Sequence, residues 1–523
     1  MAPGPWRDYP LEMRMTRAIG IAGPSEVAVR AGAAVAEAGG NAVDAAVAAT
    51  LGALCTEVAI VGLDAGAFVT IWRPGEAPVV IDGGIAMPGL NRSAERFGAA
   101  GRPVTLDYGG GMHTVVGYGA VGVGGAVAAL GEAAAGWSSL DWSALVTPAR
   151  ACVEQGFPLS RASHTWLQYS HRKIFGWQAE SAAVIHDQQG KLLPPGSRML
   201  IPGLADSLAA LATEGPELLY SGRLGGRIAA CIDAGGGLLG QDDRNAYQAL
   251  RRKPVTCEID GWTAALPPPP AIGGATLAAM SARMGAVPEQ GWTAAAVNTL
   301  AEAQRDVLEC LRAMPDDAHG ESFLDLLLSW ARAGGDPRGH RAPSTVHISA
   351  LDEDGLACAI TASSGYGSGV LVPGTGIWLN NCLGELELNP KGFHGLAPGE
   401  RIASNMSPVA ARGPDGAMLS VGSPGAERIT TALLQVMLNF MRLGMSLEEA
   451  LAAPRLHVEW ANESWRAAVE PGLPLEALTI PCRTFDELSM FFGGAGAVLR
   501  RPDGTLSAAA DPRRQGAAVV TGS

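Results

Sequence analysis

The alternation of apolar and polar residues predicts a β-hairpin that begins at Thr345. From Val346 to Ala350 every second side chain is apolar and faces one side of an extended strand, while the polar side chains from Thr345 to Ser349 face the other. A three-residue loop at Glu353 to Gly355 sets a register that places Thr345 opposite Ser363. Two hydroxyl groups are therefore expected side by side, which by pattern alone also fits an ordinary polar pair.

Periodicity and capping signals predict further helices and strands. Val27 to Leu51 contains two alanine-rich helices that are separated by Gly39-Gly40, and Asn41 is placed to cap the second helix. Small residues on all sides of these helices imply close packing. The other expected elements are strands over 67–72 and 79–82, helices over 204–212, 294–313 and about 427–443, and an exposed loop over 335–343.

Length and composition indicate one large folded protein. The chain has 523 residues, which about three or four domains would fill, but no repeat or low-complexity linker divides it, so one interwoven fold is expected. Glycine accounts for 69 residues and charged residues for 17%, as is typical of dense burial with tight turns. A net charge of −13 without any polybasic run argues against nucleic acids and anionic membranes as partners.

Targeting and metal-binding signals are missing from the sequence pattern. Prolines and charges interrupt the N-terminal stretch, so a cytoplasmic protein is expected. Three charge-free runs, over 108–131, 261–282 and 355–384, are rich in glycine, polar residues or proline, and are predicted to be buried parts of a soluble fold. The eight cysteines have neither CxxC spacing nor histidine partners, so no metal, cofactor or disulfide scaffold is expected.

Three features outside the hairpin receive structural interpretations. The GxGxxG at Gly117 to Gly122 fits a tight strand-to-helix junction better than a dinucleotide site, because no repeating βαβ pattern follows it. Glu57 and Asp64 flank an apolar segment and are expected to be satisfied core carboxylates. His347 projects on the Thr345 face, where a hydrogen-bonded structural role is favoured over a catalytic one.

Eight sequence strings occur in a fixed order between about Val27 and Trp460. They are GGNAVDAAVAATLGALC (39–55), QGFPLS (155–160), LPPPPAIGG (266–274), STVHISALDEDG (344–355), GSGVLVPGTGIWLNN (367–381), SNMSP (404–408), GSPGAERITT (422–431) and APRLHVEW (453–460). Together they resemble the gamma-glutamyltransferase family. One such string would be a weak signal, but eight collinear strings are highly specific.

The resemblance implies an N-terminal nucleophile hydrolase, a mixed α/β protein with a four-layer αββα sandwich. Such a protein is made as a precursor that cleaves its own chain before a threonine. Thr345 is the matching residue, so cleavage after Ser344 would give a large-subunit segment, 1–344, and a small-subunit segment, 345–523. The chemistry is reasonable because the new α-amine, with an ordinary pKa of about 7.7 to 8, is a local general base for the neighbouring hydroxyl.

The resemblance also assigns the other catalytic parts. Ser363 matches a family threonine whose hydroxyl bonds the nucleophile, in agreement with the hairpin register. Gly425 and Ala426 match two adjacent glycines whose N–H groups form an oxyanion hole at the entrance to a helix. Alanine at the second position keeps the N–H group but narrows the backbone freedom and the room available.

The substrate-recognition residues of the family are only partly present. Gly84 stands where the family has the arginine that clamps the substrate α-carboxylate, so Arg401, Arg428 or Arg341 would have to replace it. Glu385 alone remains, from a pair of aspartates, to receive an α-ammonium group. The other candidate substrate-binding residues, all where the family pattern changes, are Tyr366, Ser404 and Asn405.

Retained catalytic parts beside lost recognition parts predict the same mechanism on a different substrate. We expect a self-processing hydrolase that forms an acyl-enzyme with a small non-γ-glutamyl substrate. Candidates are an oxalyl or oxamate-like compound, or carbon–carbon bond hydrolysis in an alkylproline natural-product pathway. The alternatives are a true gamma-glutamyl transpeptidase with a relocated clamp, and an unprocessed, non-catalytic binding homologue. The expected partners are a small-molecule substrate and the two processed fragments for each other, with a homodimer of such pairs left open.

Overall fold

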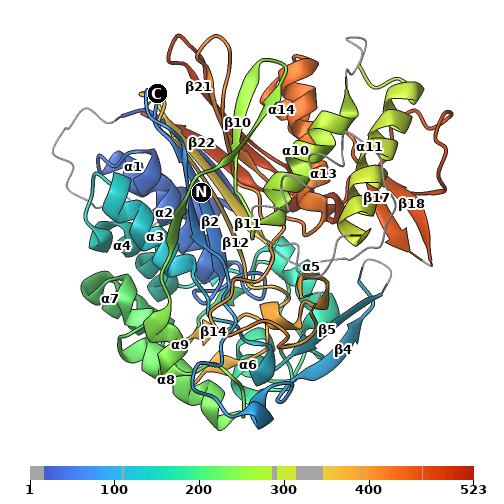
Figure 1. Cartoon of the computed structure of the whole chain (residues 1–523). Coiled ribbons are helices and arrows are strands. Elements are labelled where there is room, and N and C mark those ends of the chain that lie inside the picture. Colours follow the sequence, from blue (N-terminus) through green and yellow to red (C-terminus); the bar gives the residue numbers. More distant parts are fainter. Residues whose placement is uncertain are drawn as a thin grey trace.

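The fold is a stack of two β-sheets between two layers of helices. The structure is a computed structural model that describes residues 17–108, 111–285, 291–313, 345–389, 391–461 and 463–522. Neighbouring strands are antiparallel throughout both large sheets. Helices cover the outward face of each sheet, as Figure 1 shows. The predicted four-layer αββα sandwich is confirmed.

The first large sheet has seven strands and contains the predicted hairpin at its centre. In sheet order the strands are β22 (Ala517–Thr521), β1 (Ile19–Gly23), β11 (Val346–Asp352), β12 (Ala357–Ser363), β2 (Gly66–Trp72), β3 (Val79–Gly83) and β8 (Leu250–Arg252). Strands β2 and β3 confirm the two strands predicted before residue 100. The hairpin β11–β12 is flanked by β1 and β2, so segments far apart in the sequence meet around it.

The second large sheet has six strands and packs face to face on the first. In sheet order the strands are β21 (Leu506–Ala510), β20 (Gly496–Arg500), β16 (Met418–Gly422), β15 (Val409–Arg412), β10 (Trp262–Leu266) and β9 (Val255–Ile259). Mostly small side chains fill the space between the sheets, among them Ala22, Ala265 and Ala410, together with Leu351 and Val498. Strand β11 thereby lies directly against β16 and β20.

Four small sheets lie outside the sandwich. They pair β4 (Arg102–Leu106) with β5 (Met112–Val116), β6 (Phe157–Pro158) with β7 (Arg198–Met199), β13 (Leu371–Val372) with β14 (Ile377–Trp378), and join β17 (Leu456–Ala461), β18 (Ser464–Val469) and β19 (Cys482–Thr484). Among the described residues, only the β18–β19 pair of these strands is parallel.

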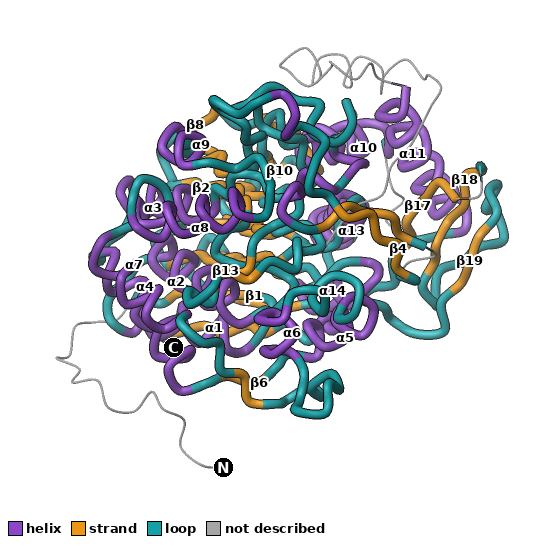
Figure 2. Tube along the Cα trace, turned by 90° about the horizontal axis from the view of Figure 1, so that it is seen from below, coloured by secondary structure: helices purple, strands orange, loops and turns teal. Residues whose placement is uncertain are grey.

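The helices form a layer on each side of the strands, as the view from below shows (Figure 2). On the side of the seven-stranded sheet lie α1 (Glu26–Glu37), α2 (Ala42–Thr56), α3 (Ala126–Trp137), α4 (Trp142–Gln155) and α7 (Leu204–Glu214). On the side of the six-stranded sheet lie α10 (Ile272–Met284), α11 (Ala294–Ala313), α13 (Arg428–Met437) and α14 (Leu447–Ala452). The remaining α-helices among the described residues are α5 (Arg161–Ser170), α6 (Ala179–Ile185), α8 (Arg223–Ala234) and α9 (Gln241–Ala246).

Helix α2 is buried on every side and begins with the predicted cap. The Asn41 side chain accepts hydrogen bonds at the first turn, and the Asp44 carboxylate accepts one from the Asn41 N–H, which completes a capping box. Helix α1 approaches it closely at Gly32, where a Cβ atom would lie 2.7 Å from the Ala45 carbonyl oxygen. The cap and the close packing predicted for residues 27–51 are therefore confirmed.

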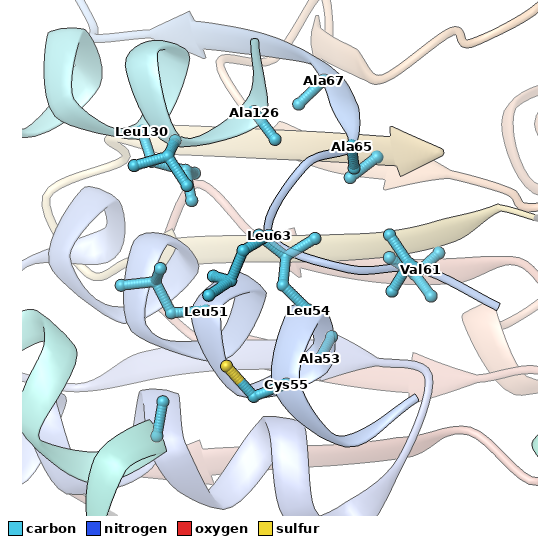
Figure 3. Close-up of a cluster of buried hydrophobic side chains, with 14 of the residues drawn as sticks. Leu51, Ala53, Leu54, Cys55, Val61, Leu63, Ala65, Ala67, Ala126 and Leu130 are labelled. Carbon is cyan, nitrogen blue, oxygen red and sulfur yellow. The ribbon is translucent and has the colours of Figure 1, made fainter. Parts of the chain in front are cut away.

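Apolar side chains of α2 also contact the next helix along the sheet. Figure 3 shows Leu51 and Leu54 packed near Leu63, which follows in the connection to β2, and near Ala126 and Leu130 of α3. Burial of each larger aliphatic side chain, such as leucine, contributes about 1.5–3 kcal/mol to stability. This core packs against the connection from α2 to β2, the strand that pairs with β12 of the hairpin.

The other predicted elements are found at or near their expected positions. Helices α7 and α11 confirm those expected over 204–212 and 294–313, and the helix expected over 427–443 is α13 followed by a π turn through Arg442. The loop expected over 335–343 lies outside the described residues. Among the described helices, none combines the length and the apolar character needed to cross a membrane.

The GxGxxG segment forms the expected junction between β5 and α3. A Cβ atom at Gly119 would lie 2.2 Å from the Ala99 carbonyl oxygen, and one at Gly122 would lie 2.3 Å from Ile85 Cγ2. Each glycine is thus required by close backbone packing. This position explains the motif without a bound dinucleotide.

Glu57 and Asp64 are buried carboxyl groups with hydrogen-bonded partners, as expected. Asp64 accepts from Arg244 Nη2 at 2.5 Å and from Asn380 Nδ2 at 2.9 Å, and Glu57 Oε2 accepts from Ser160 Oγ at 2.8 Å. Both groups therefore stabilise the core between the α2 region and its neighbours.

Candidate active site

The predicted hairpin has the register derived from its sequence. Val346 pairs with Ala362, and the same register carried one residue further places Thr345 opposite Ser363. Thr345 is 2% exposed and Ser363 is 7% exposed. The two hydroxyl-bearing residues thus lie side by side at a buried end of the central hairpin.

A narrow pocket opens at this end of the hairpin, and the space inside it is about 30 Å³. Its wall is formed by Ile85, Thr345, Ser363, Cys382, Glu385, Leu388, Ile402, Ala403, Ser404, Asn405, Met406, Ala426 and Ile429. Six of these are predicted site residues, namely Thr345, Ser363, Glu385, Ser404, Asn405 and Ala426. The other predicted residues Gly84, Tyr366, Arg401 and Gly425 are not part of this wall.

The Gly425–Ala426 turn presents two backbone donors beside the pocket. Their φ angles are +128° and +69°, and helix α13 begins immediately afterwards. Within the described part of the chain neither N–H group donates a hydrogen bond, so both are available to an oxyanion. A positive φ costs a non-glycine residue about 1–2 kcal/mol, so Ala426 is held in this conformation by its surroundings.

Gly84 and Arg401 each precede a residue of the pocket wall, and their polar groups form hydrogen bonds within the protein. The Gly84 N–H donates to Asp82 Oδ1 at 2.8 Å, and its carbonyl oxygen accepts from Arg401 Nη1 at 2.8 Å. The other Arg401 nitrogen donates to the Gln248 carbonyl at 2.5 Å, and the guanidinium carbon lies 4.0 Å from the centroid of the Tyr247 ring. The guanidinium thus has protein partners on both terminal nitrogens and over one face.

Of the other two arginines considered as a clamp, Arg428 is described and is not part of the wall. The Arg428 guanidinium carbon lies 4.5 Å from the centroid of the Phe491 ring, and Nη1 lies 3.6 Å from Glu427 Oε1. Arg341, like the cleavage residue Ser344, lies outside the described residues. Among the described residues of the wall, none is a lysine or arginine.

Arg514 is a residue of the site that the sequence did not single out. It belongs to a 3₁₀ turn, Pro512–Arg514, and its Nη1 donates to the Thr345 carbonyl oxygen at 3.4 Å, while Nε donates to the Gly493 carbonyl at 3.3 Å. Burial lowers the pKa of its guanidinium. No motif marks this position, and only the fold brings this turn near the end of the chain to Thr345.

Glu385 supplies the carboxyl group of the described pocket wall. It is 1% exposed, and within the described structure its Oε1 atom has no hydrogen-bond partner. Burial, and then the neighbouring Glu387, hold the pKa of Glu385 well above its ordinary value, while a hydrogen bond from the Cys382 thiol acts in the opposite direction. Tyr366 acts on Glu385 only indirectly, because its hydroxyl donates a hydrogen bond to the neighbouring Glu387 Oε1 at 3.2 Å.

His347 has a structural role, as the pattern favoured. Its ring nitrogens lie 2.9 Å from Thr361 Oγ1 and 2.8 Å from Ser349 Oγ, all within the hairpin or its own strand. The ring lies against Gly422, where a Cβ atom would be 2.2 Å from Cε1, so the first glycine of GSPG makes room for this histidine. Burial lowers the pKa of His347 to about 3.

Acidification is expected to remove a stability contribution of neutral His347. The folded pKa of about 3 lies below the ordinary value of 6.5, so the unfolded chain binds the proton more readily. The contribution is complete above pH 6.5 and falls by up to about 1.4 kcal/mol per unit on acidification from there toward pH 3. Chemical unfolding at several pH values should therefore show the difference between wild type and His347→Gln shrinking in acid. The exposed His113→Gln is the control, and a pH-independent difference would contradict the expectation.

The fold and this site together define the class of N-terminal nucleophile hydrolases. An antiparallel αββα sandwich carries a buried threonine at the start of a central strand, next to a hydroxyl partner and a pair of backbone donors. The gamma-glutamyltranspeptidase profile matches residues 28–322 and 314–521, and the chain belongs to that family. It is therefore an enzyme of the N-terminal nucleophile hydrolase type.

Relatives within this family carry different activities in their names. The chain is 29% identical over 526 residues to the Acylase ACY 1 proenzyme of Pseudomonas sp. (strain V22), covering 94% of this chain and 92% of the relative. It is 28% identical over 529 residues to the oxamate amidohydrolase proenzyme of Klebsiella pneumoniae, covering 95% and 97%. The cephalosporin acylase structure from Bacillus halodurans superposes with a TM-score of 0.81 at 25% identity over 99% of both chains.

Proposed function

We propose that this protein is a self-processing N-terminal-threonine acylase that hydrolyses the amide of a small, non-γ-glutamyl acyl group. The observation that carries the proposal is that Thr345, Ser363 and Ala426 line one pocket, with Gly425 next to Ala426 in the chain, and that its described wall has no lysine or arginine. The first three parts supply acyl-transfer chemistry, and the wall determines what is bound.

The proposed reaction proceeds through an ester on Thr345. The α-amine of Thr345 takes the hydroxyl proton while Oγ bonds to the carbonyl carbon, and the resulting oxyanion accepts hydrogen bonds from the N–H groups of Gly425 and Ala426. The protonated amine then gives its proton to the leaving nitrogen as the C–N bond breaks. Water next loses a proton to the α-amine, adds to the ester carbon and releases the acid, while the proton returns to Oγ. Ser363 holds the threonine hydroxyl in position.

The pocket argues against a γ-glutamyl substrate. Gly84 stands at the clamp position, and Arg401, the residue closest to taking over that role, already donates to two backbone carbonyls. A bidentate guanidinium–carboxylate contact contributes roughly 1.5–3 kcal/mol, so its loss weakens binding of a free α-carboxylate. The lack of a lysine or arginine in the described wall also disfavours oxalyl and oxamate-like anions, although one relative is named as an oxamate amidohydrolase.

An acylase is therefore favoured over the other candidate reactions. Two relatives that match nearly the whole chain are named acylases, and their names concern amide hydrolysis. Carbon–carbon bond hydrolysis in an alkylproline pathway would use the same nucleophile and remains a second candidate. A true gamma-glutamyl transpeptidase would need a clamp that the described wall does not offer.

Intact mass spectrometry of freshly purified protein tests the first step of the proposal. Separate masses for residues 1–344 and 345–523 are expected, because hydrolysis needs the free α-amine of Thr345. The two fragments should elute together from a size-exclusion column in native buffer. A full-length mass that persists after long incubation would overturn the proposal and favour an unprocessed binding homologue.

A further inference from the structure

We propose that the pocket selects amides whose acyl group is uncharged and carries a hydrogen-bond acceptor, which receives a hydrogen bond from the Glu385 carboxyl group. The inference rests on the proposed function and names the substrate class of the same site. It starts from Glu385, which lines the pocket with Thr345 and Ser363 and whose buried Oε1 atom has no partner among the described residues.

The chemistry of the wall favours an uncharged acyl group. Of its thirteen residues, eight are apolar, and four of the remaining five carry only hydroxyl or amide groups. An anionic acyl group would be desolvated here without a cation, which is strongly unfavourable. Apolar contacts from residues such as Leu388, Ile402 and Met406 instead suit the carbon chain of a neutral acyl group.

The surroundings of Glu385 favour its protonated form. Burial and the carboxyl group of Glu387, from the next 3₁₀ turn, raise the pKa of Glu385, and a hydrogen bond from the Cys382 thiol opposes them only in part. Glu387 is itself bonded by the Tyr366 hydroxyl and lies near Glu427. Burial and the facing acidic groups both disfavour the carboxylate form of Glu385.

The cation that could counter this acidic group is held elsewhere. Arg428 lies next to Glu427 in the chain, and its guanidinium rests on the Phe491 ring with Nη1 3.6 Å from Glu427 Oε1. No lysine or arginine of the described wall reaches Glu385. A neutral carboxyl group has one O–H donor, and an unpartnered oxygen in the wall can direct it to a carbonyl, ether or hydroxyl oxygen of the substrate.

Three p-nitroanilides of equal chain length test the selection directly. Levulinyl is neutral with a ketone acceptor, glutaryl ends in a carboxylate and γ-aminobutyryl ends in an ammonium group. With processed wild-type enzyme at pH 7, kcat/KM for the levulinyl amide is expected to exceed that of both charged amides by about tenfold or more. Preference for a charged amide would overturn the inference and leave the acylase function intact. No hydrolysis of any amide, with Thr345 shown to be a free terminus, would overturn the proposed function itself.

The role of Glu385 is tested by two substitutions with the levulinyl amide. In wild type, kcat/KM should fall as pH rises through the elevated pKa of Glu385, because the carboxylate loses its donor. Glu385→Gln keeps a donor at every pH, so this alkaline decline should disappear. Glu385→Ala should raise KM and lower kcat/KM about tenfold, with the smaller change in kcat.

A surface substitution of the same kind is the control. Glu37 at the end of α1 is exposed, so Glu37→Gln should keep both the alkaline decline and the substrate preference. Fragment masses show that each variant has folded and processed. An alkaline decline that persists in Glu385→Gln, or a levulinyl-to-glutaryl ratio that is unchanged in Glu385→Ala, would refute the assignment.

Discussion

Thr345→Ala is expected to yield a folded protein that stays one chain of 53.7 kDa and has lost at least about 10⁴-fold in amide hydrolysis. Alanine lacks the hydroxyl group that, in the proposed mechanism, attacks the carbonyl carbon both in cleavage of the chain and in catalysis. Its packing should be kept, because Thr345 lies at the end of β11 and the strand pairing with β12 uses backbone groups. Intact mass and turnover of the levulinyl amide measure the two losses.

Thr345→Ser separates the role of the hydroxyl from that of the side-chain shape. Serine keeps the nucleophilic oxygen, so cleavage and some turnover should return, at reduced rates. Thermal unfolding of the alanine variant compared with processed wild type checks that the fold is intact. An alanine variant that is still cut before residue 345 and active would show that another group is the nucleophile.

Arg513→Met is expected to lower the free energy of unfolding by about 3–5 kcal/mol. The Arg513 guanidinium is fully buried, donates to Glu470, and lies 3.1 Å from Asp511 Oδ1. Asp511 is shared with Arg455 Nη2 at 2.6 Å. Methionine fills much of the volume but leaves Glu470 without its cation, and that uncompensated charge is the cost.

Chemical unfolding of Arg513→Met beside Arg223→Met isolates the effect of burial. Arg223 pairs with Glu214 at 3.1 Å on the surface, where both side chains are largely exposed, so its replacement should cost less than about 1 kcal/mol. Arg513 precedes Arg514, which donates to the Thr345 carbonyl. As denaturant is added, Arg513→Met should therefore lose activity at a lower concentration than the one that unfolds it. Equal changes in the two variants would contradict the prediction.

Local chemistry allowed the hairpin to be derived from the sequence alone. Alternation from Thr345 and the turn before Leu356 were sufficient to give the register that β11 and β12 adopt, because strand pairing across a tight turn depends on neighbouring residues. The same holds for the Asn41 cap of α2, which needs only a side chain and the N–H groups that follow it. The αββα layers came from the resemblance to a family, and the order of the strands was not predicted.

The surroundings of the pocket could not be derived in this way. Arg514 meets Thr345 across 169 positions of sequence, and nothing near it repeats or alternates. Glu385 was expected to be a charged group for an ammonium ion, whereas its charge state depends on burial and on Glu387, which only the folded chain supplies. Likewise Arg401 was one of three arginines considered as a replacement for the clamp, and its guanidinium donates to backbone carbonyls of distant segments.

The central position of β11 has a consequence for the history of the protein. Each large sheet takes strands from both sides of residue 345, with β1 and β2 flanking β11 and β12, and β10 pairing with β15. A chain cut before Thr345 would therefore become two interleaved fragments that had folded while they were still one chain. Once such a pair is unfolded and diluted, reassembly becomes a second-order encounter instead of a search within one molecule. Recovery of the cut pair after unfolding should depend on protein concentration, whereas recovery of the uncut Thr345→Ala chain should not. Cleavage would therefore make refolding inefficient in dilute solution.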